Sequence, residues 1–161
     1  MTEPTSTDAV RIERIVAAPI AVVWQMWTDP IHFAAWYGPG GATVIVEEMD
    51  LGVGGRRHVE MRVATPGGER RMWFTGEHLE IAAPHRLIYT ESMADEHGAI
   101  LSPAALGMPE DHPTTTTVTV ELEDLGGRTR MTMTHAGIPQ DSPGAMGWNM
   151  AFDKLAAHLA G

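Results

Sequence analysis

The sequence predicts an α+β fold in which one long C-terminal helix packs against a curved antiparallel sheet. The first observation is an apolar stripe with helical spacing over residues 142–160. Its members are Trp148, Phe152, Leu155 and Leu159. The second observation is a series of six consecutive segments with strand-like alternation and turn residues between them. An alternating sheet keeps one face in water, so its apolar face needs a cover, and the C-terminal helix is long enough to provide it.

One strand and two short helices are expected before this series. Residues 10–16 mix apolar and charged side chains in an imperfect alternation, which indicates an extended first strand. Pro19 suits the first position of a helix, and Asp29 or Thr28 can cap a second helix. That second helix is expected to run through Ile31, Phe33 and Trp36.

The six further strands follow from alternation and from glycine-rich turns. Their expected ranges are 43–49, 57–63, 71–81, 86–93, 116–125 and 129–135. Gly76 lies inside one of them and is expected to mark a bend or a bulge. The segment 94–113 has no clear period and is long for a connection in a compact domain. It is interpreted either as a lid, binding loop or interface, or as a tolerated surface insertion.

Length and composition restrict the classes of partner. A chain of 161 residues suggests one domain, here residues 9–161, after a polar tail at residues 1–8 that is expected to be disordered. A net charge of −10 argues against nucleic acid and anionic membranes as partners. The absence of cysteine, of a signal-like start and of a membrane-length apolar run makes a cytoplasmic location the default expectation. The eight histidines show no metal-binding spacing, so no metal is expected. The glycine-rich segments 38–41 and 52–55 do not join a strand to a helix as phosphate-binding loops do, and no cofactor is expected.

Short motifs spread along the chain resemble the Aha-type domain, named for an activator of the heat-shock-90 chaperone's ATPase. They are Ala18-Pro19, Asp29-Pro30, Trp36-Tyr37-Gly38-Pro39, Gly54-Gly55-Arg56, Pro84-His85-Arg86, Tyr89-Thr90-Glu91, Gly127-Arg128-Thr129 and Gly147-Trp148. That family belongs to the START/birch-pollen-allergen-like (SRPBCC) superfamily. The resemblance implies the helix-grip fold: a seven-stranded antiparallel sheet wrapped around the C-terminal helix, with two short helices after the first strand and a cavity between sheet and helix.

The resemblance has two departures and one limit. Arg57 stands after the double glycine where an apolar or aromatic residue is expected, and the segment 94–113 is longer than in many such domains. Both are expected to alter the mouth of the cavity. Chaperone activation is not carried over, because the activator has an additional N-terminal domain that this sequence does not contain.

The cavity hypothesis places functional side chains at sheet positions that face the helix. Glu91 alternates in phase with Tyr89, and His135 with Met131 and Met133, so both polar groups are expected to point inward. A histidine there can hydrogen-bond a ligand or act as a general acid or base, and burial would raise the pKa of a glutamate. The alternatives are a histidine satisfied at the cavity rim and a glutamate turned to solvent by a bulge. The expected ligand-binding residues are Trp73, His78, Tyr89, Glu91, Met131, Met133, His135, Trp148 and Phe152; no catalytic residue is assigned.

The leading functional prediction is a binding module that holds a small hydrophobic or aromatic molecule between sheet and helix. One alternative is a cyclase-like or hydrolase-like enzyme, which two inward-facing titratable groups within hydrogen-bond reach would favour. Another is a protein that interacts with a chaperone or other partner through an exposed apolar patch on 94–113 or a sheet edge. A homodimer is left open.

Overall fold

A computed structural model describes residues 9–106, 113–140 and 142–160. The elements in chain order are β1 (Ala9–Val16), α1 (Ile20–Thr28), α2 (Pro30–Trp36), β2 (Thr43–Met49), β3 (Arg56–Thr65), β4 (Gly68–Ala82), β5 (Arg86–Ala94), the 3-10 turn η1 (Ala104–Leu106), β6 (Thr116–Asp124), β7 (Thr129–Ala136) and α3 (Pro143–Ala160). This order confirms the predicted α+β fold. The tail 1–8, expected to be disordered, lies outside the described residues.

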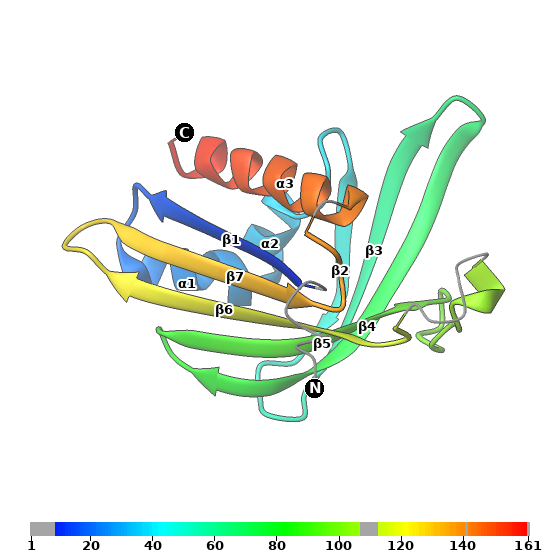
Figure 1. The fold of residues 1–161 in the computed structure, drawn as a ribbon, viewed down its shortest axis with the longest axis horizontal. Coiled ribbons are helices and arrows are strands. Elements are labelled where there is room, and N and C mark those ends of the chain that lie inside the picture. The colour runs from blue at the N-terminus through cyan, green and yellow to red at the C-terminus, as the bar shows by residue number, and fades with distance from the viewer. Residues whose placement is uncertain (1–8, 107–112, 141, 161) are drawn as a thin grey trace, which may run out of the picture.

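The seven strands form one antiparallel sheet with the order β1-β7-β6-β5-β4-β3-β2. β1 and β2 are therefore the two edges, although they are separated in the chain only by α1 and α2. The sheet curves, and α3 lies across its concave side, while the β3–β4 hairpin extends beyond the helix (Figure 1). The helix-grip arrangement expected from the resemblance is confirmed.

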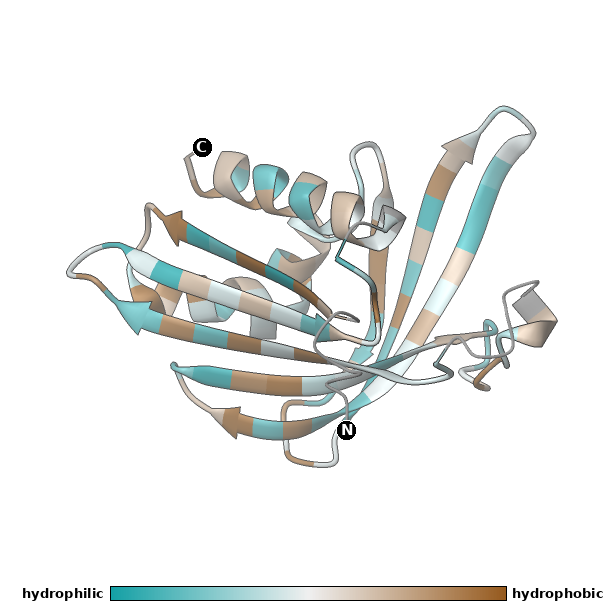
Figure 2. Ribbon diagram, viewed as in Figure 1, coloured by the Kyte–Doolittle hydropathy of each residue, from teal (hydrophilic) through white to brown (hydrophobic). Residues whose placement is uncertain are grey.

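Alternation along the strands sends one set of side chains toward α3. Val118 and Val120 in β6, and Met131 and Met133 in β7, are all buried. The bands of opposite hydropathy along these strands follow the same period of two (Figure 2). From α3, the stripe residues Trp148, Phe152 and Leu155 are buried, and Leu159 packs at the edge of the core.

Aromatic rings from the three helices fill one part of the core. Trp27 of α1 lies 4.8 Å from Trp36 and 6.0 Å from Trp148, measured between ring centroids. Asp29 caps α2 by accepting from the backbone N–H groups of residues 31 and 32, which confirms the predicted cap. The predicted helix through Ile31, Phe33 and Trp36 is confirmed; Phe33 and Trp36 are buried, whereas Ile31 in the first turn is 80% exposed.

β4 carries an irregularity, but it does not lie at Gly76. The register between β4 and β5 shifts between His78 and Glu80. At Gly76 the reason for glycine is a close backbone approach: a Cβ there would lie 1.9 Å from the carbonyl oxygen of Thr90. The expected bulge at Gly76 is therefore corrected to a contact that only glycine permits, with the bulge two to four residues later.

The described part of the long connection after β5 folds back on itself. Ala94 forms a bridge with Ile100, and the carboxylate of Asp95 accepts from the backbone N–H groups of His97 and Ala99. Residues 107–112 lie outside the described part. The helices described in the structure do not combine the length and apolarity that crossing a bilayer requires.

Candidate functional site

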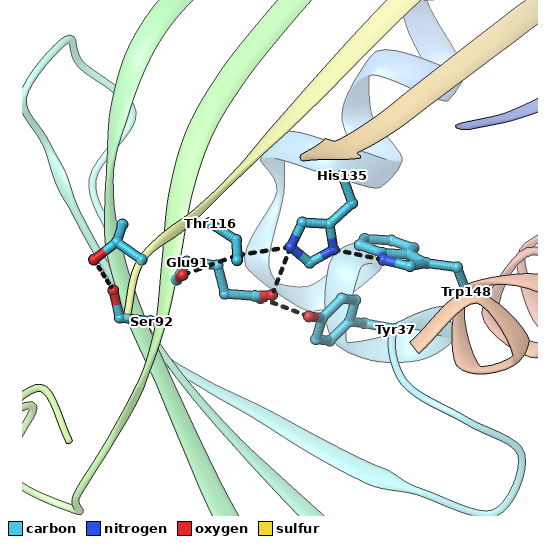
Figure 3. A network of polar contacts seen from close by, with 7 residues as sticks. Tyr37, Glu91, Ser92, Thr116, His135 and Trp148 are labelled. Atoms are coloured by element: carbon cyan, nitrogen blue, oxygen red, sulfur yellow. Dashed lines mark hydrogen bonds and ion pairs between the residues drawn. The ribbon is translucent and has the colours of Figure 1, made fainter. Parts of the chain in front are cut away.

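A cavity of about 250 Å³ lies between the first half of α3 and the sheet. Its lining residues are Tyr37, Gly38, Pro39, Met61, Phe74, Glu91, Met93, Pro113, Thr114, Thr116, His135, Ile138, Gly144, Gly147, Trp148 and Ala151. Most of these side chains are apolar. The buried polar groups among them gather at one place, the cluster formed by Tyr37, Glu91, Thr116, His135 and Trp148, which is called the polar cluster below (Figure 3).

Small residues on α3 leave the space that the cavity occupies. Gly144, Gly147 and Ala151 line it from positions about one turn apart. A Cβ added at Gly147 would meet no atom within 4 Å. A side chain added at Gly147, which lines the cavity, would therefore begin in open space.

The turn between α2 and β2 closes one side of the cavity. Gly38 takes a φ of +85°, a conformation that favours glycine, and the chain then passes Pro39. The ammonium group of Lys154 in α3 donates to the backbone carbonyls of Tyr37 and Pro39, each at 3.1 Å. Burial lowers the pKa of Lys154. The turn is thus fastened to the helix that forms the opposite wall.

Hydrogen bonds at His135 determine where its proton lies. The indole Nε1–H of Trp148 can only donate, and it points at Nδ1 of His135 at 2.9 Å. Nδ1 is therefore an acceptor, and the neutral ring carries its proton on Nε2. Nε2 lies 2.7 Å from Oγ1 of Thr116, whose own proton goes to the backbone carbonyl of Glu91 at 3.1 Å. The chain of donors and acceptors is complete only with a neutral His135 (Figure 3).

The Glu91 carboxylate enters the cavity beside this chain. Its Oε2 accepts from the phenol of Tyr37 at 2.7 Å, while its Oε1 lies 3.8 Å from Nε2 of His135, beyond hydrogen-bond distance. Burial and the neighbouring Glu91 charge raise the pKa of Tyr37. Burial lowers the pKa of His135, and the attraction of Glu91 only partly opposes this. Near neutral pH the Tyr37 phenol therefore keeps its proton and His135 is uncharged.

A second group of polar side chains lies deeper, outside the cavity lining. The guanidinium carbon of Arg57 lies 3.6 Å from the ring centroid of Tyr89 and 5.2 Å from that of Phe33. His78 meets Tyr89 edge-on. Burial raises the pKa of Tyr89 and, together with the Arg57 charge, lowers that of His78. Arg57 was expected to alter the cavity mouth. It is only 3% exposed, so it is a core residue instead.

The structure brings together three of the residues predicted for the site. Glu91, His135 and Trp148 all line the cavity. The four predicted residues that are buried in the core outside its lining are Tyr89, Met131, Met133 and Phe152. Met131 and Phe152 instead line a smaller space of about 180 Å³ under the C-terminal half of α3. His78 is buried beside Tyr89, away from the cavity lining.

Trp73 is placed on the other face of the sheet. Its neighbours Met72 and Phe74 pair with Met61 of β3 and Met93 of β5, which line the cavity with Phe74. Trp73 has the opposite parity, and the guanidinium of Arg71 stacks 4.9 Å from its ring centroid. The expectation that Trp73 contributes to the cavity is corrected for this reason.

Sequence reasoning missed two members of the polar cluster, Tyr37 and Thr116. Tyr37 is 54 positions from its partner Glu91, and only the packing of α2 against the sheet brings them together. Thr116 is the first residue of β6, and no local sequence pattern marks it as a site residue. The small residues of α3 could have indicated the cavity, because Gly144, Gly147 and Ala151 share a helical face beside Trp148.

The remaining predictions concern the long segment and metal binding. Pro113 and Thr114 line the cavity, whereas Gly98 lies beside Arg56 and His58 of β3. The described part of the segment thus reaches the cavity only at its end. Within the described ranges, no three His, Asp or Glu side chains gather closely enough to hold a metal ion.

Comparisons with known proteins identify relatives over nearly the whole chain. Residues 17–160 match the family model of the Activator of Hsp90 ATPase homolog 1-like protein. A solved structure of a Chromobacterium violaceum protein is 26% identical, with a TM-score of 0.76 over 96% of this chain and 98% of its own. One from Arthrobacter aurescens is 28% identical, with a TM-score of 0.75 over 96% and 87%. The AHSA1 protein from Silicibacter pomeroyi, at 20% identity and a TM-score of 0.70 over 94% and 97%, supports the fold alone. No curated protein matches the chain.

Proposed function

This chain belongs to the Activator of Hsp90 ATPase homolog 1-like family, and we propose that it binds a small apolar or aromatic molecule in the cavity between α3 and the sheet. Membership in this family suggests a ligand-binding fold. The observation that carries the proposal is the composition of the cavity wall: apolar side chains over most of its surface and a single polar cluster. Binding sites for small molecules have this composition, in which a few polar groups fix the orientation.

The size of the cavity limits the ligand. Sites for drug-sized molecules are typically about 300–1,000 Å³, and this cavity is about 250 Å³. A molecule of one or two rings fits this space better than a sterol or a long acyl chain. The aromatic faces of Tyr37, Phe74 and Trp148 supply flat surfaces for such rings.

The state of the titratable groups favours binding over proton transfer. Glu91 and His135 are 3.8 Å apart, and both ring nitrogens of His135 already have hydrogen-bond partners. Tyr37 and Glu91 are within hydrogen-bond reach at 2.7 Å, but the raised pKa of Tyr37 keeps the phenol protonated. A general acid or base works best with a pKa near the operating pH. Burial instead moves the pKa of Tyr37 upward and that of His135 downward, in both cases away from neutral pH.

Filling the cavity tests the proposal. Gly147→Leu places an isobutyl group in the open space at that position, and leucine also favours helix over glycine, so the variant should remain folded. Naphthalene is the probe, and its affinity is measured by ligand-observed NMR and by the rise in melting temperature. We expect wild type to bind and Gly147→Leu to lose at least tenfold in affinity. Met146→Leu, whose side chain is 67% exposed on the same helix, is the control and should bind as wild type does. Equal binding by wild type and Gly147→Leu would overturn the proposal, and so would a wild type that binds neither naphthalene nor any naphthalene derivative with a polar head group.

A further inference from the structure

The hydrogen donors of the polar cluster are already committed to protein acceptors. The indole N–H of Trp148 goes to Nδ1 of His135, and the Nε2 proton of His135 goes to Thr116. The Thr116 hydroxyl donates to the Glu91 carbonyl, and the Tyr37 phenol donates to the Glu91 carboxylate. Within the described cluster, each side-chain N–H or O–H thus has a partner before any ligand enters.

The polar cluster can still accept hydrogen bonds from a ligand. Oε1 of Glu91 has no hydrogen bond among the described residues, its nearest polar contact being His135 Nε2 at 3.8 Å. A carboxylate oxygen can accept two hydrogen bonds, and the phenol oxygen of Tyr37 retains a lone pair. A ligand in the cavity would cover this oxygen, and covering an acceptor without supplying a donor is costly, so a ligand that brings a donor gains affinity.

No cation contacts this acceptor in the described structure. Within 4 Å, the ion-pairing partner of Glu91 is His135, which burial and the indole bond keep neutral. Arg57 is the buried cation nearby, but its guanidinium lies over the Tyr89 ring and does not line the cavity. The ammonium group of Lys154 donates to the backbone carbonyls of the turn after α2. A ligand anion would therefore face the Glu91 carboxylate with no donor free to receive it.

We infer that the ligand carries a hydrogen-bond-donating head group, an alcohol, a phenol or an amine, on its apolar body, and that carboxylic acids are excluded. The head group donates to Oε1 of Glu91, and the rings lie against the aromatic and methionine side chains of the wall. This inference rests on the proposed cavity binding and adds the chemical class of the ligand to it. It gives Glu91 the role of the residue that determines ligand specificity.

A series with one ring system tests the head group. The probes are 1-naphthol, 1-naphthylmethylamine, 1-methoxynaphthalene and 1-naphthoate, and calorimetry or NMR titration gives each dissociation constant. A hydrogen bond to a charged acceptor corresponds to about tenfold or more in affinity. We expect naphthol and the amine to bind at least about tenfold more tightly than the methoxy compound, with naphthoate weakest. Comparison of naphthol with the amine separates neutral donors from cationic ones.

Two variants assign the preference to Glu91. Glu91→Gln keeps the size and an acceptor for Tyr37 but adds N–H donors, so the ratio of amine affinity to naphthoate affinity should fall at least about tenfold. Tyr37→Phe keeps the carboxylate and should keep the amine ahead of the acid. If wild type binds none of the four probes, the proposed cavity binding itself fails. If the probes bind and Gly147→Leu abolishes binding, but naphthoate equals the amine or the methoxy compound equals naphthol, cavity binding stands and the donor inference is overturned.

Discussion

The indole N–H of Trp148 donates to Nδ1 of His135 at 2.9 Å, and this one bond fixes the tautomer of the histidine. An imidazolium carries a proton on both nitrogens, so protonated His135 would point an N–H at another N–H. The bond therefore opposes protonation in addition to the effect of burial, which also lowers the pKa of His135. Because Trp148 belongs to the stripe that holds α3 on the sheet, the position of the helix and the charge state of the site are connected.

Removing the indole donor of Trp148 should make His135 easier to protonate. In Trp148→Phe the ring stays aromatic but Nδ1 has no indole N–H beside it, so protonation becomes easier. We expect the pKa of His135 to rise from its lowered position toward the usual value of about 6.5. An NMR titration of the histidine ring protons measures the shift. Trp73→Phe, on the other face of the sheet, is the control and should leave the His135 titration unchanged; an unshifted His135 in Trp148→Phe would contradict the assignment.

Stability should fall as the pH drops below about 6.5. The unfolded imidazole takes up a proton near that pH, while folded His135 stays neutral until lower pH because its pKa is lowered. In this window the unfolded state binds more protons, so the free energy of unfolding rises with pH. Urea unfolding between about pH 5 and pH 8 measures the slope. His135→Gln should reduce it, and His78, whose pKa is also lowered, should supply part of what remains.

A separate acid transition is expected from the outer face of the sheet. Glu60 accepts from the guanidinium groups of Arg62 at 2.8 Å and Arg71 at 2.6 Å. These hydrogen bonds lower its pKa from 4.5 to about 2. A lowered carboxyl pKa stabilises the fold above the unfolded value, and the contribution disappears as the pH falls through about 2. Glu60→Gln should lose this part of the acid dependence, and Glu77→Gln, exposed in β4, should retain it.

Two glycines should respond in opposite directions to alanine. At Gly76 a Cβ would lie 1.9 Å from the Thr90 carbonyl, so Gly76→Ala forces β4 and β5 apart and should destabilise the protein by more than about 2 kcal/mol. At Gly147 a Cβ meets nothing within 4 Å, and alanine is the better helix former by about 1 kcal/mol. Gly147→Ala should thus be neutral or stabilising. Thermal and urea unfolding of both variants compare them, and an equal loss at both positions would contradict the geometry.

The fold could be predicted from the sequence because its periodic patterns are long and clear. Val118 and Val120 alternate with threonines, and Trp148 and Phe152 recur at helical spacing, so each pattern specified one element and one buried face. Glu91 and His135 were assigned inward by the same alternation, and both are.

The remaining site residues could not be predicted, for identifiable reasons. Met72, Trp73 and Phe74 are three consecutive large apolar residues, so no alternation indicates that the middle one faces outward. The distance from Tyr37 to Glu91 depends on how α2 packs on the sheet, which no local pattern records. Arg57 was expected to alter the cavity mouth, but its guanidinium group packs on the rings of Tyr89 and Phe33 in the core, and no local pattern records that packing.

We propose that the ligand enters the cavity beside the polar cluster. Proton–nitrogen correlation spectra during a titration with 1-naphthol test it most directly, because tryptophan indole N–H signals report on both faces of the sheet. Trp148 lines the cavity and Trp73 lies on the opposite face. We predict that the Trp148 indole signal shifts saturably, that the Trp73 signal stays in place, and that Gly147→Leu removes the Trp148 shift. A Trp148 signal that does not move in wild type, or a shift confined to Trp73, would contradict ligand binding in this cavity.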